Sequence, residues 1–120
     1  MASSTDKELL ELAAKAAGIY IEFDLDGKAY LSNDYVKEWN PLTDDGDALR
    51  LAVKLKLIIT FADGGAWPHV CVGRRLGPFH NEKLPNKMFA LDEELELTRR
   101  AIVRAAAELG KASVEIGKTL

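Results

Sequence analysis

The stretch between residues 39 and 57 constrains the fold more than any other part of the chain. It contains a proline, a cluster of helix-capping residues and a long apolar run, in that order. Pro41 fixes its own φ angle and disfavours α geometry at the residue before it, so a helix can begin only beyond it. Thr43, Asp44 and Asp45 can each accept hydrogen bonds from the free N–H groups of a first helical turn. The sequence therefore predicts a helix that starts at this cluster.

The apolar residues that follow recur at helical spacing, which is typical of a helix that packs on a core. Arg50 and Lys54 lie four residues apart on another side of that helix. We expect the apolar face to be buried, and it comprises Ala48, Leu49, Leu51, Ala52, Val53 and Leu55.

The closely spaced aspartates in this stretch also resemble the opening of a calcium-binding loop. Such a loop needs a glycine at its sixth position and a glutamate at its twelfth. Neither residue stands at the required spacing from Asp44 or from Asp24. We therefore interpret the aspartates as helix caps and expect no metal and no other cofactor.

Length and composition indicate one ordered domain that spans residues 1–120. A chain of 120 residues and 13.2 kDa has enough material for one hydrophobic core but not for two. Its residues are 48% hydrophobic and 29% charged, which is ordinary for a globular protein and excludes wholesale disorder.

Two further features predict the cellular compartment. No apolar run approaches the length needed to cross a bilayer, and residues 1–6 lack the basic and apolar regions of a signal peptide. Cys71 is the single cysteine, so the chain cannot form an internal disulfide. We expect a cytoplasmic protein that is not attached to a membrane.

The N-terminal part predicts a helix followed by a β-hairpin. Thr5 or Asp6 can cap a helix over residues 5–17, and Gly18 is suited to end it. Residues 19–24 have the β-branched and aromatic character of a strand, and Asp26-Gly27 favours a tight turn into a second strand at 28–31. We interpret residues 32–38 as a loop with room for one helical turn.

The C-terminal part predicts two strands and a long helix. Residues 57–61 are almost uninterruptedly apolar, which predicts a strand buried on both faces at the centre of the sheet. Residues 69–73 follow as its antiparallel neighbour. Residues 91–109 form the longest helix, which Gly110 is placed to stop, and residues 111–120 could fray or extend it weakly. We predict an α+β fold, in the order α-β-β-α-β-β-α, with a four-stranded, mainly antiparallel sheet covered by helices.

Charge is distributed unevenly along the chain. Residues 1–49 hold 4 basic and 11 acidic residues (−7), residues 50–90 hold 7 and 2 (+5), and residues 91–120 hold 5 and 6 (−1). Most of the positive charge lies in or near residues 74–89. The apolar residues of this segment show neither helical nor strand periodicity, so we predict a long loop. We take this basic segment with its neighbouring aromatic residues as the candidate binding surface, comprising Trp67, His69, Arg74, Arg75, Phe79, His80, Lys83 and Lys87.

The same region offers weaker patterns for metal binding and catalysis. His69 and Cys71 would share one face of a strand, and His80 could complete three zinc ligands, but the usual fourth ligand is missing. As a nucleophile and base, Cys71 and His69 lack a third residue that would orient the base. We therefore expect neither a zinc site nor an enzyme.

Two segments resemble sequences in a known group of proteins. They are Trp39-Asn-Pro-Leu-Thr-Asp-Asp-Gly-Asp-Ala-Leu-Arg-Leu-Ala-Val-Lys-Leu55 and Arg99-Arg-Ala-Ile-Val-Arg-Ala-Ala-Ala-Glu-Leu-Gly110. Together they resemble the recurring segments of small proteins encoded by tailed bacteriophages and prophages, and they cover about a quarter of the chain. The resemblance implies an origin in the bacterial host cytoplasm, but it implies no activity and no catalytic residue.

We expect a non-enzymatic accessory protein that binds a host or phage protein through the basic segment. Arginine and aromatic side chains are enriched in protein interfaces, which favours this hypothesis. The alternative is a nucleic-acid-binding module that uses the same residues, since basic groups neutralise phosphates and aromatic rings stack on bases. Self-association stays open, because the helix at 91–109 carries enough alanine and leucine to pair with a copy of itself.

Overall fold

The computed structural model describes residues 5–32, 34–62, 69–74, 79–83 and 91–119. For a few of these positions it describes the backbone alone, namely residues 34–36, 62, 69, 79–83 and 113–119. The described chain contains three helices and two separate antiparallel sheets of three strands each. In chain order the elements are α1 (Asp6–Ala17), β1 (Ile21–Phe23), β2 (Ala29–Leu31), β3 (Asp34–Glu38), α2 (Asp45–Leu55), β4 (Ile58–Ala62), β5 (His69–Gly73), β6 (Phe79–Lys83) and α3 (Leu91–Thr119).

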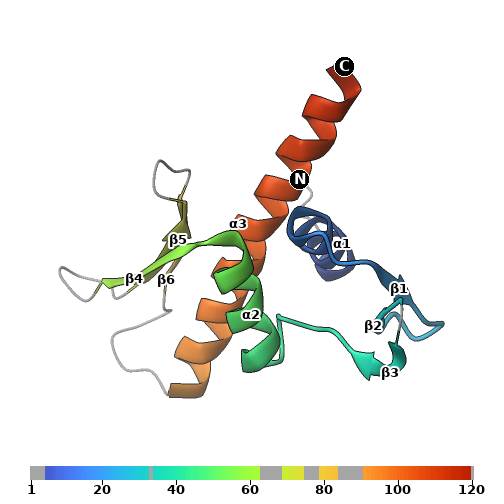
Figure 1. Cartoon of the computed structure of the whole chain (residues 1–120). Helices are drawn as coiled ribbons and strands as arrows, with labels where there is room; N and C mark the ends of the chain where they lie inside the picture. The colour runs from blue at the N-terminus through green and yellow to red at the C-terminus, as the bar shows by residue number, and fades with distance from the viewer. Residues whose placement is uncertain (1–4, 33, 63–68, 75–78, 84–90, 120) are drawn as a thin grey trace.

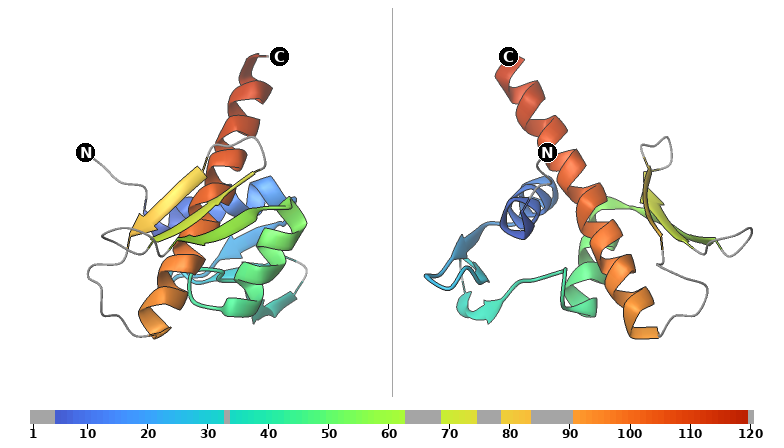
Figure 2. Two further views of the ribbon diagram at one scale, coloured as in Figure 1. Left: turned by 90° about the vertical axis from the view of Figure 1, so that its left-hand side faces the viewer. Right: turned by 180° about the vertical axis from the view of Figure 1, so that it is seen from behind.

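Helix α3 forms the centre of the molecule. Helices α1 and α2 pack against it, and the two sheets lie on opposite sides of it (Figure 1). The same arrangement is seen from behind in Figure 2, where the sheet β4-β5-β6 and the sheet β1-β2-β3 flank α3. The α+β class is therefore confirmed, with a helix rather than a sheet at its centre.

One hydrophobic core joins the three helices to both sheets. Alanines dominate where α1 and α3 meet, which lets the two helices approach closely. Val70 and Val72 of β5 project into the same core and are almost completely buried. The core residues are Leu9, Leu10, Ala13, Ala14, Ala17, Trp39, Leu42, Ala48, Leu51, Ala52, Val70, Val72, Ala101, Ile102, Val103, Ala105, Ala106 and Ala107.

The predicted first helix is confirmed, including both of its ends. The Thr5 side chain accepts a hydrogen bond from the Glu8 N–H at 3.1 Å, as expected for an N-cap. Gly18 has φ 71°, in the left-handed region that favours glycine, and its N–H bonds back to carbonyls of the last turn.

The predicted stop at Gly110 is wrong, because α3 continues through it to Thr119, as the alternative for residues 111–120 allowed. Gly110 is buried, and a Cβ atom at this position would collide with the carbonyl oxygen of Leu12 in α1. The glycine therefore allows two helices to touch backbone to backbone and does not end one of them. The prediction of a stop was based on the preference of glycine for helix ends. The structure shows that glycine is needed here because the neighbouring helix comes so close.

The predicted four-stranded sheet is not what the structure shows. β1 pairs with β2 and β2 with β3, while β4 pairs with β5 and β5 with β6, so each sheet has three strands. Two strands lie in segments that we predicted to be loops: β3 within residues 32–38 and β6 within residues 74–89. β6 has the sequence Phe-His-Asn-Glu-Lys, which lacks apolar alternation and owes its conformation to pairing with β5.

The predicted centre of the sheet is also wrong. β4 lies at an edge, and the middle strand of its sheet is β5. Phe61 of β4 is 61% exposed, whereas Val72 of β5 is fully buried. An apolar run marks a strand, but the order of strands depends on which of them the helix α3 covers.

The apolar face of α2 is only partly buried. Ala48, Leu51 and Ala52 lie in the core as predicted, but Leu49 and Val53 are exposed. The predicted face is wider than the surface that neighbouring elements cover, since α2 packs chiefly on α3. Among the described helices, none combines the length and apolar character needed to cross a membrane.

Candidate functional site

The structure describes only part of the binding surface predicted from the sequence. Trp67, Arg75 and Lys87 lie outside the described residues. Arg74 directly follows β5 and is exposed. The other four candidates lie on adjacent strands, of which the structure describes the backbone: His69 in β5, and Phe79, His80 and Lys83 in β6.

The ladder between β5 and β6 sets the positions of these candidates relative to each other. His69 stands opposite Lys83, while His80 stands opposite Val72 and Phe79 opposite Gly73. Cys71 is paired with Asn81 rather than with His80. Within the described part of the chain, no three residues among His, Cys, Asp and Glu are grouped so that they could hold a metal ion.

A polar cluster at the start of α2 is held by several side-chain hydrogen bonds. The Asp44 carboxylate accepts from the Asp47 N–H at 2.8 Å, which identifies Asp44 as the N-cap among the three candidates. Asp47 is buried, and its two oxygens accept from the Asn40 N–H at 3.0 Å and from Arg50 Nη2 at 2.7 Å. The side chains of this cluster thus hold one another and the backbone before the helix.

Helix α3 contributes to the same cluster through Arg99. Its Nε donates to the carbonyl oxygen of Leu42 at 2.8 Å, and its Nη1 pairs with Asp45 at 2.6 Å. The guanidinium group thereby fixes the turn before α2 onto α3. Because the charged groups of this cluster are paired within the chain, we interpret it as structural and not as a ligand site.

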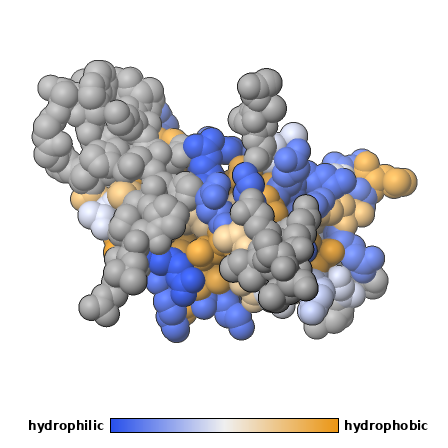
Figure 3. Space-filling model, turned by 90° about the horizontal axis from the view of Figure 1, so that it is seen from above, coloured by the Kyte–Doolittle hydropathy of each residue, from blue (hydrophilic) through white to orange (hydrophobic). Residues whose placement is uncertain are grey.

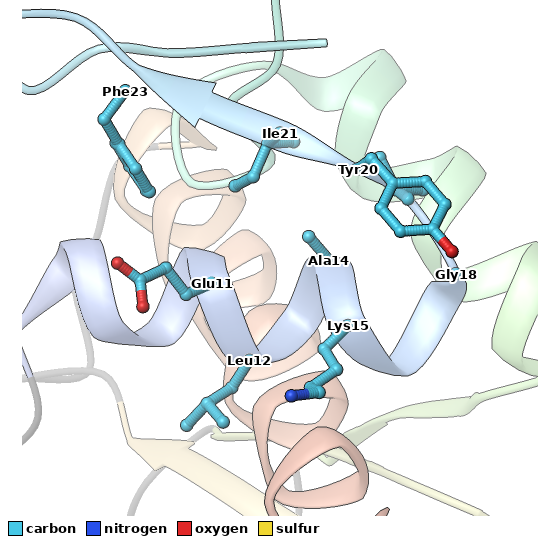
Figure 4. Close-up of a pocket in the computed structure, with 9 residues that line it drawn as sticks. Glu11, Leu12, Ala14, Lys15, Gly18, Tyr20, Ile21 and Phe23 are labelled. Atoms are coloured by element: carbon cyan, nitrogen blue, oxygen red, sulfur yellow. The ribbon is translucent and has the colours of Figure 1, made fainter. Parts of the chain in front are cut away.

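A groove between α1 and β1 is lined mostly by apolar residues. Its volume is about 570 Å³. Ile21 and Phe23 project from β1 toward α1, and Ala14 lies on the helix opposite them (Figure 4). The groove is lined by Glu11, Leu12, Ala14, Lys15, Gly18, Ile19, Tyr20, Ile21 and Phe23.

The rim of this groove combines an exposed aromatic ring with charged groups. Tyr20 is 82% exposed and lies beside Gly18, at the end of α1 (Figure 4). Glu11 and Lys15 stand four residues apart on α1 and place one charge of each sign along the opposite wall. At the far end, Lys7 Nζ lies 5.0 Å from the centre of the Phe23 ring, within the range of a cation–π contact.

A second hollow of about 470 Å³ continues from the groove around Tyr20. It shares Gly18, Ile19 and Tyr20 with the groove and adds Leu31 and Ser32. Seen from above, hydrophobic surface is interspersed among hydrophilic side chains on the side where the β1-β2 hairpin lies (Figure 3). Because they share Gly18, Ile19 and Tyr20, the two hollows form one continuous surface beside β1.

The hairpin beside the groove is acidic. Asp24 caps its turn, since its Oδ1 accepts from the N–H groups of Asp26 and Lys28, both at 2.9 Å. Asp26 is itself exposed. Asp24 and Asp26 therefore place negative charge beside the groove, while Glu11 and Lys15 carry one charge of each sign within it.

The sequence analysis did not identify this groove. Ile19, Ile21 and Phe23 alternate as on one face of a strand, and in the structure they pack against the core and also line the groove. The remaining signal was Tyr20, a large ring on the opposite side of that alternation. Comparison with known proteins adds no candidate, because no family model, no curated protein and no solved structure matches this chain.

Proposed function

We propose that this protein is a non-enzymatic module that binds another protein through the groove between α1 and β1. The observation that carries the proposal is an apolar groove of about 570 Å³ with an exposed tyrosine at its rim. Tyrosine is enriched among the residues that dominate binding energy in protein interfaces. Binding a host or phage protein would agree with the accessory role expected for a phage or prophage product.

The free edge of β1 favours a partner segment in extended conformation. Within the described residues β1 pairs with β2 alone. The Tyr20 carbonyl and the Asp24 N–H bond toward the β2 hairpin, at 2.9 Å each. By the alternation of an antiparallel ladder, Ile21 and Phe23 direct their backbone groups to the free edge. A strand added there would receive backbone hydrogen bonds while its side chains entered the groove.

Charge indicates what the partner segment carries. The β1-β2 hairpin beside the groove carries three acidic residues and one basic residue over positions 21–31, whereas Glu11 and Lys15 on α1 offset each other. Basic residues in the partner are therefore favoured on the hairpin side. The same carboxylates would repel phosphates, which argues against nucleic acid at this groove. We therefore propose a segment with alternating large apolar and basic residues.

Nucleic-acid binding by the basic segment stays a second prediction. Of its eight candidate side chains, the structure describes only that of Arg74, which is exposed as binding to phosphate requires. A fluorescent-oligonucleotide titration at low salt tests it, since affinity driven by phosphates must fall steeply as salt increases.

The groove is tested by affinity capture from infected or lysogenic cells with mass spectrometry, using Tyr20→Ala as the first variant. Tyr20 is mostly exposed, so its removal should leave the fold intact while weakening partner binding about tenfold or more. Glu11→Lys reverses a rim charge and should also reduce capture. Leu25→Ser is the matched control, because Leu25 is a fully exposed apolar residue that does not line the groove.

A defined probe makes the test independent of the cell extract. A fluorescent nine-residue peptide that alternates valine and lysine should bind wild type more tightly than a peptide that alternates valine and glutamate. Equal capture by all three variants and wild type, or equal affinity for the two peptides, would rule out the groove as the binding surface.

A further inference from the structure

Strand β4 presents an unprotected edge on the side of α3 away from the groove (Figure 1). Its sequence, Ile-Ile-Thr-Phe-Ala, contains neither a charged residue nor a proline. Ile58 is 40% exposed and Phe61 is 61% exposed. Within the described residues, the backbone of β4 pairs only with β5. The edge thus offers both hydrogen-bonding groups and apolar side chains to another strand.

Edges of this kind promote uncontrolled association, and proteins usually protect them. The common protective features are a charged side chain within the strand, a proline, a bulge or a covering helix. β4 has neither of the first two, and its pairing with β5 runs without a shift from Ile58 to residue 62. The exposures of Ile58 and Phe61 show that the described elements leave both side chains partly accessible.

We propose that β4 pairs in antiparallel orientation with β4 of a second copy, with Thr60 on the two-fold axis. This contact would join the β4-β5-β6 sheet of one copy to the same sheet of the other copy. The result would be one sheet of six strands, three from each copy. A strand that pairs with itself in this way uses the same surface on both subunits, so the assembly closes as a dimer. Thr60 is exposed and uncharged, so two copies can meet there without repulsion.

The side chains match in this register. Ile59 of one copy stands opposite Phe61 of the other, and an aromatic ring beside a β-branched residue is a favourable cross-strand pair. Ile59 and Phe61 share their face of the sheet with Val70 and Val72, because they are paired across the ladder with β5. The dimer would therefore extend the apolar layer that already packs on α3.

Charge favours the antiparallel orientation over the parallel one. Lys56 lies just before β4 and is exposed, and Arg74 follows Gly73, the residue paired with Ile58. Both charges thus gather at the start of β4. Around an axis at Thr60, the two Lys56 residues stand about 27 Å apart at 3.4 Å per residue, well beyond the screening length of about 8 Å at physiological salt. A parallel pair would place them side by side.

The dimer should be weak and dependent on concentration. A pair of five-residue strands buries less than the roughly 1,600 Å² that is typical of stable interfaces. Sedimentation equilibrium of the full chain over a wide concentration range should therefore show a monomer that converts to a dimer. A wild-type chain that stays monomeric throughout, or that forms open-ended polymers, would overturn the proposal.

Charged substitutions at Thr60 test the register in which the two β4 strands pair. Thr60→Lys and Thr60→Glu should each dimerise at least tenfold more weakly than wild type, since two like charges would meet at the axis. An equimolar mixture of the two variants should regain dimer, because opposite charges would then face each other. Val53→Lys is the control, as it adds the same charge at an exposed site on α2 and should leave dimerisation unchanged.

The mixture also separates self-pairing from docking of a different protein. If both single variants dimerise as wild type does, or if their mixture stays monomeric, Thr60 does not lie on the axis and the proposal fails. The result is independent of the groove, since Tyr20→Ala should leave the dimer unchanged and Thr60→Lys should leave peptide binding unchanged.

Discussion

The start of α2 and the edge formed by β4 differ in whether their polar and apolar groups make contacts within the described chain. At the start of α2, the buried Asp47 carboxylate and the Leu42 carbonyl find partners within the chain, from Asn40, Arg50 and Arg99. At the β4 edge, two large apolar side chains are exposed and the outer backbone groups have no strand beside them within the described residues.

The contrast distinguishes groups that build the fold from groups that are left for a partner. A polar cluster with all its charges paired adds stability and has little capacity left for a ligand. The outer backbone groups of an unprotected edge are left for pairing with another strand, so such an edge is a surface for association. Substitutions at the first region should therefore change stability, and substitutions at the second should change assembly.

The largest loss of stability is expected for Asp47→Ala. The change removes the acceptor of the Asn40 N–H and of Arg50 and leaves a partly buried donor unpaired. We expect the free energy of unfolding to fall by about 2 to 3 kcal/mol. Urea unfolding measures it, with Asp44→Ala as a comparison. That change removes the cap and an exposed 3.8 Å ion pair with Arg50, and it should cost about 1 kcal/mol. Equal losses would mean that Asp47 acts as no more than a second cap.

Gly110→Ala should cause the next largest loss and lower the free energy of unfolding by about 2 kcal/mol, because the added Cβ atom would force α1 away from α3. Thermal unfolding by circular dichroism measures the loss. Gly46→Ala is the comparison and should cost less, since its nearest atoms are side-chain atoms of Arg50 and Asp44 at 3.1 to 3.2 Å and not backbone. A Gly110→Ala variant as stable as wild type would contradict the close approach of the two helices.

Arg99→Ala should lower the free energy of unfolding by about 1 to 2 kcal/mol, because the buried Leu42 carbonyl loses its donor. Asp45→Ala removes only the ion pair at the exposed carboxylate and should cost less than about 1 kcal/mol. Urea unfolding of both variants ranks the two contacts. A larger loss for Asp45→Ala would show that the ion pair, and not the bond to the backbone, anchors α2 to α3.

The smallest effect on stability is expected for Thr60→Lys. At an exposed edge position, the free energy of unfolding should change by less than about 0.5 kcal/mol at protein concentrations where the monomer dominates. Urea unfolding at low and at high concentration measures this. Wild type should gain stability with concentration, whereas the variant should gain none. A large loss in the dilute variant would show that the edge contributes to the monomer fold.

Local signals predicted the helices better than the sheets. Thr5 and Gly18 bound α1 as expected, and the cluster at residues 43–45 contained the true cap of α2, Asp44. These signals succeed because a cap acts within one helical turn. β3 and β6 were missed because their conformation depends on pairing with strands elsewhere in the chain, which sequence periodicity does not report.

The candidate site was harder to predict than the fold. The basic segment was predicted as a binding surface because of its charge, but of its eight candidate side chains the structure describes only that of Arg74. The groove at Tyr20 and the edge at Phe61 consist of residues whose sequence pattern is that of core strands. Their exposure follows from the limited surface that three helices can cover.

By itself, the sequence determined where the helices begin, that strands separate them, and that one core holds the domain. Those properties follow from capping and periodicity, which act over a few residues. Only the tertiary structure decided that Gly110 joins two helices, that β4 lies at an edge, and that Ile21 and Phe23 line a groove. Burial depends on which distant segments meet, so the same apolar residue can belong to a core or to a binding surface.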